Sequence, residues 1–161
     1  MHENRLLAIA ASGQRVGFVF LQDQEVVFWQ VSRKAGSSPK KACAVLKQIM
    51  ANLNPALVLV QSADGLKGKK RKQVLNRIAR AASDTPCLVQ RGCLQRTHAN
   101  KYAAAAALAD RHPALAPHCP PARQTKDSGE PHTIVLFTAL GLADQYLNEG
   151  NPVLRAAAAM G

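Results

Sequence analysis

The sequence predicts one α/β domain with a five-stranded mixed sheet flanked by helices. Three apolar segments follow one another near the amino end, and their connections are too short to hold helices, which favours an antiparallel meander. Two later strand-like segments each follow a helical pattern, which favours right-handed parallel crossovers. The chain has 161 residues, 47% of them hydrophobic, so it can bury a substantial core.

The meander is expected over residues 5–11, 15–21 and 25–31, which are rich in Val, Phe, Ile and Leu. The following Gly-Ser-Ser-Pro phrase is expected to stop the strands. Within it, Ser38 is the predicted N-cap of a helix, and Pro39 is its first helical residue.

The middle of the chain predicts two crossovers. Apolar side chains recur at helical spacing over 39–53, and the uninterrupted apolar run 56–61 is typical of a strand buried on both faces. A second helix is predicted to begin near Lys70, after a glycine-broken loop, and a short fifth strand is predicted at 87–90.

The carboxyl-terminal part is expected to be helical. The sequence predicts an alanine-rich helix over 97–111, a proline-punctuated loop over 112–131 and a last helix over 132–148. Residues 5–148 are therefore interpreted as the domain, and 149–161 as a short tail.

The formal net charge of +11 and a pI of about 10.0 indicate a polyanionic partner, nucleic acid before membrane. A merely soluble basic protein is the alternative. The four cysteines form no CxxC pair and are expected to be reduced thiols. With neither a signal peptide nor a membrane span in the sequence, a cytoplasmic location is expected.

Three segments of the sequence, together with the predicted element order, resemble one known group of proteins. They are "LLAIAASGQRVGFVF", "NPALVLVQS" and "ADRHPALAPHCPPARQTKDSGEPHTIVLFTALGLA". Over roughly residues 5–148 the chain resembles the ribonuclease H-like fold, and within it the RuvC-like branch of Holliday junction resolvases and their relatives.

The resemblance implies two-metal phosphodiester hydrolysis in active relatives, which needs clustered carboxylates around two divalent ions. The acids stand at the end of the first strand, at the end of the fourth and on the last helix, converging on one edge of the sheet. The matching positions here are Ala10, Gln61 and Thr138, and none of them is acidic. A degenerate site with no catalytic residue, no metal and no cofactor is therefore expected.

Other readings of these positions remain open. In one alternative, Asp64, Asp127 or Glu130 replaces the missing acids in an active structure-selective endonuclease that uses Mg²⁺ or Mn²⁺, whereas Asp144 is expected to point elsewhere on the last helix. Ala10 and Gln61 could also be engineered changes, although the drift at Thr138 favours natural decay.

The strongest functional pattern is a run of cations after the fourth strand, suited to phosphate contacts. This basic cluster comprises Lys67, Lys69, Lys70, Arg71, Lys72, Arg77 and Arg80. A looser stretch is formed by Arg91, Arg96 and Lys101, with His98 as a further candidate. A solvated helix face is the alternative interpretation of the basic cluster.

Few aromatic residues are available for base stacking, so recognition of duplex or branched nucleic acid by shape and charge is expected, with DNA favoured over RNA. The protein is expected to act as a homodimer or as a subunit of a larger nucleoprotein complex; a protein-interaction scaffold is the remaining alternative. The spacing of His112, His118, Cys119 and His132 matches no common zinc site.

Overall fold

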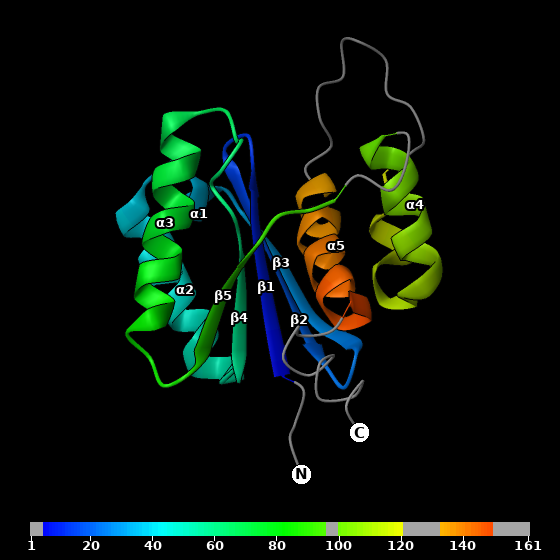
Figure 1. Cartoon of the computed structure of the whole chain (residues 1–161), viewed down its shortest axis with the longest axis horizontal. Helices are drawn as coiled ribbons and strands as arrows, with labels where there is room; N and C mark the ends of the chain where they lie inside the picture. The colour runs from blue at the N-terminus through cyan, green and yellow to red at the C-terminus, as the bar shows by residue number, and fades with distance from the viewer. Residues whose placement is uncertain (1–4, 96–99, 121–132, 150–161) are drawn as a thin grey trace.

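The structure is a computed structural model that describes residues 5–95, 100–120 and 133–149. One sheet with strand order β3-β2-β1-β4-β5 lies between two layers of helices (Figure 1). β1 pairs antiparallel with β2 and parallel with β4, and the outer pairs are β2–β3, antiparallel, and β4–β5, parallel. The predicted mixed α/β sheet is confirmed. The strands are β1 (Arg5–Ser12), β2 (Arg15–Gln22), β3 (Glu25–Ser32), β4 (Leu57–Gln61) and β5 (Leu88–Gly92).

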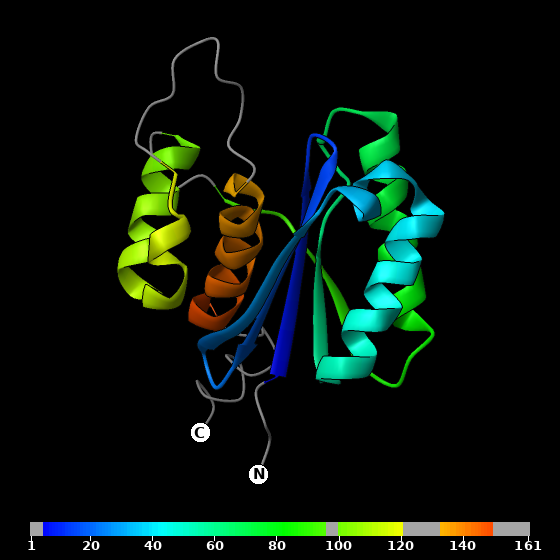
Figure 2. The ribbon, with the colours of Figure 1, turned by 180° about the vertical axis from the view of Figure 1, so that it is seen from behind.

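The helices cover both faces of the sheet. Figure 2 shows one layer on either side of the strands. The first layer contains α1 (Arg33–Ser37), α2 (Pro39–Leu53) and α3 (Lys69–Ser83). The second contains α4 (Lys101–Arg111), the 3₁₀ helix η1 (Pro113–His118) and α5 (Ile134–Glu149). None of the described helices is both long and apolar enough to cross a membrane.

Strand alternation sends neighbouring residues of β1 to opposite helical layers. Leu7 and Ile9 belong to the core beneath α2 and α3, whereas Ala8 and Ala10 belong to the core beneath α4 and α5. β1 is therefore buried on both faces, as is β4, which explains the apolar runs of both strands.

Two glycines allow helices to approach the strands closely. A Cβ at Gly17 would lie 2.8 Å from the carbonyl oxygen of Val135, so the first turn of α5 rests directly on β2 beside Ala10. A Cβ at Gly36 would overlap the carbonyl of Gln14, so α1 packs against the β1–β2 turn only because residue 36 has no side chain.

The short helix α1 is absent from the sequence-based prediction, which placed a simple stop there. The side chain of Ser32 accepts a hydrogen bond from the backbone of Ala35 at 3.0 Å and caps this extra turn. The predicted cap of α2 is confirmed, since Ser38 accepts from Lys41 and Pro39 is the first helical residue.

Other boundaries also differ from the prediction. The side chain of Asn100 accepts from two backbone N–H groups, so α4 begins at Lys101 and not at residue 97. The predicted loop 112–131 contains η1, and its later part lies outside the described residues. β5 continues to Gly92, which places Arg91 inside the strand and not after it.

Candidate nucleic-acid interface

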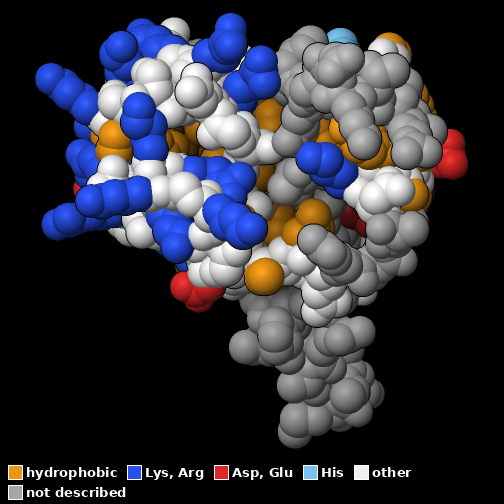
Figure 3. Space-filling view, turned by 90° about the horizontal axis from the view of Figure 1, so that it is seen from above, with side chains coloured by type: hydrophobic (Ala, Val, Ile, Leu, Met, Phe, Trp, Pro, Cys, Tyr) orange, Lys and Arg blue, Asp and Glu red, His pale blue; other side chains and the backbone are white. Residues whose placement is uncertain are grey.

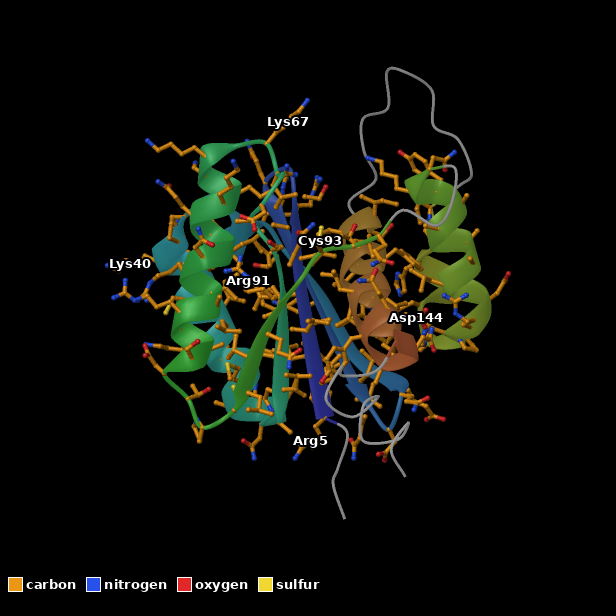
Figure 4. The ribbon with its side chains drawn as sticks, viewed as in Figure 1. Arg5, Lys40, Lys67, Arg91, Cys93 and Asp144 are labelled. Carbon is orange, nitrogen blue, oxygen red and sulfur yellow. The ribbon has the colours of Figure 1, made fainter. Side chains whose placement is uncertain are left out.

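The candidate site lies at the edge of the sheet where β1 and β4 end. Figure 4 shows Arg5, at the start of β1, at the opposite end of the molecule from Lys67, in the loop after β4. The β1–β2 turn, α1, residues 62–68 and the start of α3 meet at this edge, which we call the carboxyl edge. The carboxyl ends of parallel strands are a common place for binding sites in α/β proteins.

Two of the three predicted degenerate positions lie side by side at the carboxyl edge. Ala10 is fully buried on the α5 side of β1. The side-chain oxygen of Gln61 accepts a hydrogen bond from the backbone N–H of Ala11 at 3.0 Å. Regular pairing of β1 with β4 stops one residue earlier, at Ile9 and Val60, so the Gln61 side chain continues the ladder. This local environment contains neutral groups where a metal site would need carboxylates.

Thr138 lies on the same side of the sheet, in α5. Its hydroxyl donates to the carbonyl oxygen of Ile134 at 3.3 Å, and its half-buried side chain lines a cavity of about 240 Å³ between α4 and α5. Within residues 5–95, 100–120 and 133–149, no three His, Cys, Asp or Glu side chains are grouped so that they could hold a metal ion.

The expectation that Asp144 points elsewhere than Thr138 agrees with its contacts, which are made with the end of α4. Both residues nevertheless line the same cavity, because the cavity follows α5 over several turns and takes in a broad arc of its surface. The Asp144 carboxylate accepts from Arg111 at 2.6 Å, from His112 at 3.2 Å and from Asn148 at 3.1 Å. Asp144 therefore ties the end of α4 to α5.

Of the remaining candidate acids, Asp64 alone lies among the described residues. Asp64 is exposed in the loop after β4, where its backbone N–H donates to the hydroxyl of Ser62 at 3.2 Å. Asp127 and Glu130 lie outside the described residues.

Arg91 extends from β5 to the end of β4 and to α3. Its guanidinium donates to the backbone carbonyl of Gln61 at 3.0 Å and to the side-chain oxygen of Asn76 at 3.2 Å. Partial burial lowers the pKa of Arg91 from its ordinary value, and the negative charge of Asp64 opposes that shift. The guanidinium nevertheless stays charged at any physiological pH, because arginine starts from a very high pKa. It fixes a positive charge beside the carboxyl edge.

The basic cluster occupies the loop before α3 and the exposed side of that helix. All its members are exposed except Arg71, which is half-buried. α3 begins after Gly68 with no side-chain cap, and its first turn holds cations and no acid. Viewed onto the carboxyl edge, Lys and Arg side chains gather over the α1–α3 half of the molecule (Figure 3).

The second predicted basic stretch does not form one surface. The Arg91 side chain turns toward α3, whereas Lys101 starts α4 in the opposite helical layer and contacts the ring of Tyr102. Arg96 and His98 lie outside the described residues. Exposed cations of α1 and α2 lie instead on the same side as the basic cluster, and the sequence-based prediction missed them. The sequence feature that could have identified them is the absence of Asp and Glu from residues 33–53, which form α1 and α2.

The aromatic and histidine side chains take structural positions. Phe18, Phe20 and Phe137 are buried in the core. The ring of His118 packs on Trp29, with the ring centroids 5.4 Å apart. The three buried phenylalanines are therefore core residues and not platforms for base stacking.

Comparison with known proteins adds evidence on the fold alone. The sequence matches no family model and no curated protein. The structure is similar to RuvC of Thermus thermophilus, free and in complex with a Holliday junction substrate. Both similarities have a TM-score of 0.62 at 14% identity, and they cover 91% of this chain and 96% of the other. Sheet order, helical layers and this similarity together show that the chain has a RuvC-like fold of the ribonuclease H-like class.

Proposed function

We propose that this chain is a catalytically inactive RuvC-like domain that binds nucleic acid, with DNA favoured, through the basic cluster. It would act as a homodimer or as a subunit of a nucleoprotein complex. The observation that carries the proposal is the start of α3, where exposed Lys69, Lys70 and Lys72 stand at the carboxyl edge with no acid in the same turn.

Several physical arguments support binding at this place. Cations in the first turn of a helix are unfavourable beside the positive end of the helix dipole, by about 0.3–1 kcal/mol each. A bound phosphate would convert the lysines and the free N–H groups of that turn into favourable partners. The RuvC that this structure resembles was itself observed with a Holliday junction.

The inactivity follows from the charge at the three degenerate positions. Two adjacent divalent ions need carboxylates to offset their mutual repulsion. Here Ala10 has no ligand atom, and the Gln61 oxygen already accepts from Ala11. Thr138 can offer only a neutral hydroxyl, and this group donates to Ile134.

Binding is tested by replacing lysines of α3 with a residue of similar length and no charge. The variant Lys69→Gln, Lys70→Gln, Lys72→Gln leaves half-buried Arg71 in place. We expect affinity for a DNA duplex or four-way junction to fall at least about tenfold near 0.1 M salt, because each phosphate contact releases counterions. Fluorescence anisotropy over a range of salt concentrations measures this loss and the accompanying decrease in salt slope.

The control variant carries the same change in net charge on the opposite helical layer. It combines Ala103→Glu, Ala106→Glu and Ala116→Glu, all at exposed positions of α4 and η1. It should bind nearly as the unmodified protein does. If the α3 variant binds no more weakly than this control, the basic cluster is not the binding site.

Inactivity is tested on the same junctions and duplexes with Mg²⁺ or Mn²⁺. We expect binding without cleavage. Cleavage that disappears in the Asp64→Ala variant would show an active enzyme with a displaced acid and would refute the proposal.

A further inference from the structure

The net positive charge of the protein comes from one part of the chain. Residues 33–80 contain twelve of the 21 Lys and Arg residues and one of the ten Asp and Glu residues. The rest of the chain has nine of each sign and is formally neutral. The whole net charge of +11 therefore belongs to the segment that forms α1, α2, β4 and α3.

The structure places this charge on the outside of one helical layer. The cations of α1 and α2 are exposed, as are those of the basic cluster apart from Arg71. Figure 4 shows Lys40 pointing away from the sheet on the outer side of that layer. We call this the helical-layer surface; it consists of the basic cluster together with Arg33, Lys34, Lys40, Lys41 and Lys47.

Within the part of the chain that the structure describes, these cations have no acidic partner in an ion pair. Arg111 and His112 form ion pairs with Asp144, and among the described residues no ion pair is seen for a residue of 33–80. The single acid of the segment, Asp64, exerts its charge on Arg91. A repulsive arrangement of this kind is costly to the folded state unless an external anion offsets it.

The start of α2 repeats the pattern of α3. Lys40 and Lys41 occupy its first turn, which holds no acid. The two helices lie side by side on the same face of the sheet (Figures 1 and 2), and the lysines of both helices are exposed. The missing acids are thus a property of the layer and not of one helix.

The composition of residues 33–80 favours a duplex over a single-stranded nucleic acid. Residues 33–80 contain no Phe, Trp or Tyr, so this surface offers no platform on which the bases of a single strand could stack. α2 and α3 have 15 residues each, or about 22 Å of helix. Duplex DNA carries roughly 13 phosphates over that axial length, about twice as many as one strand. A duplex therefore matches twelve cations better than a single strand does.

We propose that the helical-layer surface binds the phosphate backbone of double-stranded DNA across α1, α2 and α3, without reading the bases. The inference rests on the proposed function and extends it, because it assigns binding residues on α1 and α2 that lie outside the basic cluster. The duplex would lie along the outer side of this layer, away from the core that contains Ala10 and from the cavity that Thr138 lines.

The test uses an α2 variant with Lys40→Gln, Lys41→Gln and Lys47→Gln. Binding is measured by anisotropy with a 20-base-pair DNA duplex, the same sequence as an RNA duplex, and one single strand. The α4–η1 control variant from the preceding test serves again. For the duplex we expect the α2 variant to lose at least about tenfold in affinity near 0.1 M salt, and its salt slope to decrease by about 0.9 per lysine that contacts a phosphate.

The outcomes separate this inference from the proposed function. If the α3 variant loses affinity and the α2 variant does not, the basic cluster binds alone and the wider surface is refuted. If neither variant loses affinity, the proposed function fails as well. Tighter binding of the single strand or the RNA duplex would refute the choice of double-stranded DNA. If the unmodified protein binds poly-glutamate but none of the three nucleic acids, the proposal is refuted and the partner of this surface is an acidic protein.

Discussion

At the scale of single residues, the neutral side chains of Ala10 and Gln61 serve the fold. Ala10 fills a fully buried place beneath α5, and Gln61 supplies the acceptor for Ala11 where the β1–β4 ladder ends. An unpaired backbone N–H at such a place would cost about 1–3 kcal/mol. Gln61 thus keeps a hydrogen bond that a metal-binding glutamate would have to share with its ion.

The degeneracy can be tested by putting the acids back. The variant Ala10→Asp, Gln61→Glu, Thr138→Asp should unfold at a lower temperature than the unmodified protein in the absence of metal, because it crowds carboxylates into a partly buried place. Mn²⁺ should raise its melting temperature, since a ligand that binds only the folded state stabilises it. Thermal unfolding with increasing Mn²⁺ measures both effects.

The matched control for the restored site is Ala10→Asn, Thr138→Asn with Gln61 unchanged, which has nearly the same shapes and no added charge. Its melting temperature should not respond to Mn²⁺. A response of the unmodified protein as large as that of the acidic variant would mean that a metal already binds, and the degenerate reading would be wrong.

At the scale of elements, two helical glycines face different kinds of neighbouring atoms. Gly36 of α1 faces rigid backbone, because a Cβ there would overlap the Gln14 carbonyl. Gly141 of α5 faces the tip of a side chain, since a Cβ there would lie 3.0 Å from the Cδ1 atom of Leu94. Leu94 is 38% exposed and has room to move.

The two glycine-to-alanine changes should therefore have different effects on stability. Gly36→Ala should destabilise the protein by about 1–3 kcal/mol, as expected for overpacking against atoms that cannot move. Gly141→Ala should be neutral or stabilising by up to about 1 kcal/mol, because alanine favours the helix. Urea unfolding measures both values. Equal destabilisation by the two changes would contradict this account of how α1 is held.

The sequence predicted the elements that have a clear apolar period or a clear helix cap. The prediction failed for the element whose formation depends on tertiary contacts. The five strands, α2 and α3 were readable from apolar spacing and from the Ser38 cap. α1 was not, because it depends on Ser32 as a cap and on the glycine contact with Gln14. The neutral character of Ala10, Gln61 and Thr138 was readable, but the contacts of Gln61 and Arg91 required the fold.

At the scale of the whole molecule, one helical layer carries all the net charge and the other half is formally neutral. The fold resembles RuvC at 14% identity, so the same architecture is compatible with very different sequences. Surface charge is free to change on such a scaffold, because most exposed substitutions alter stability by less than about 0.5 kcal/mol. A one-sided charge of this size nevertheless creates repulsion that the core must offset.

This repulsion predicts an unusual response of stability to salt. Raising NaCl from about 0.02 to 0.3 M shortens the screening length from roughly 20 Å to about 6 Å, less than the roughly 22 Å length of α2 or α3. If screening recovers about 1 kcal/mol, the melting temperature should rise by roughly 2–4 °C for a chain of this size.

A variant that combines the six lysine-to-glutamine changes of α2 and α3 should melt higher at low salt and respond much less to NaCl. The Ala103→Glu, Ala106→Glu, Ala116→Glu control should keep most of the salt response, because its added acids lie on the opposite layer. An equal salt response in the six-lysine variant would show that the repulsion does not reside on the helical-layer surface.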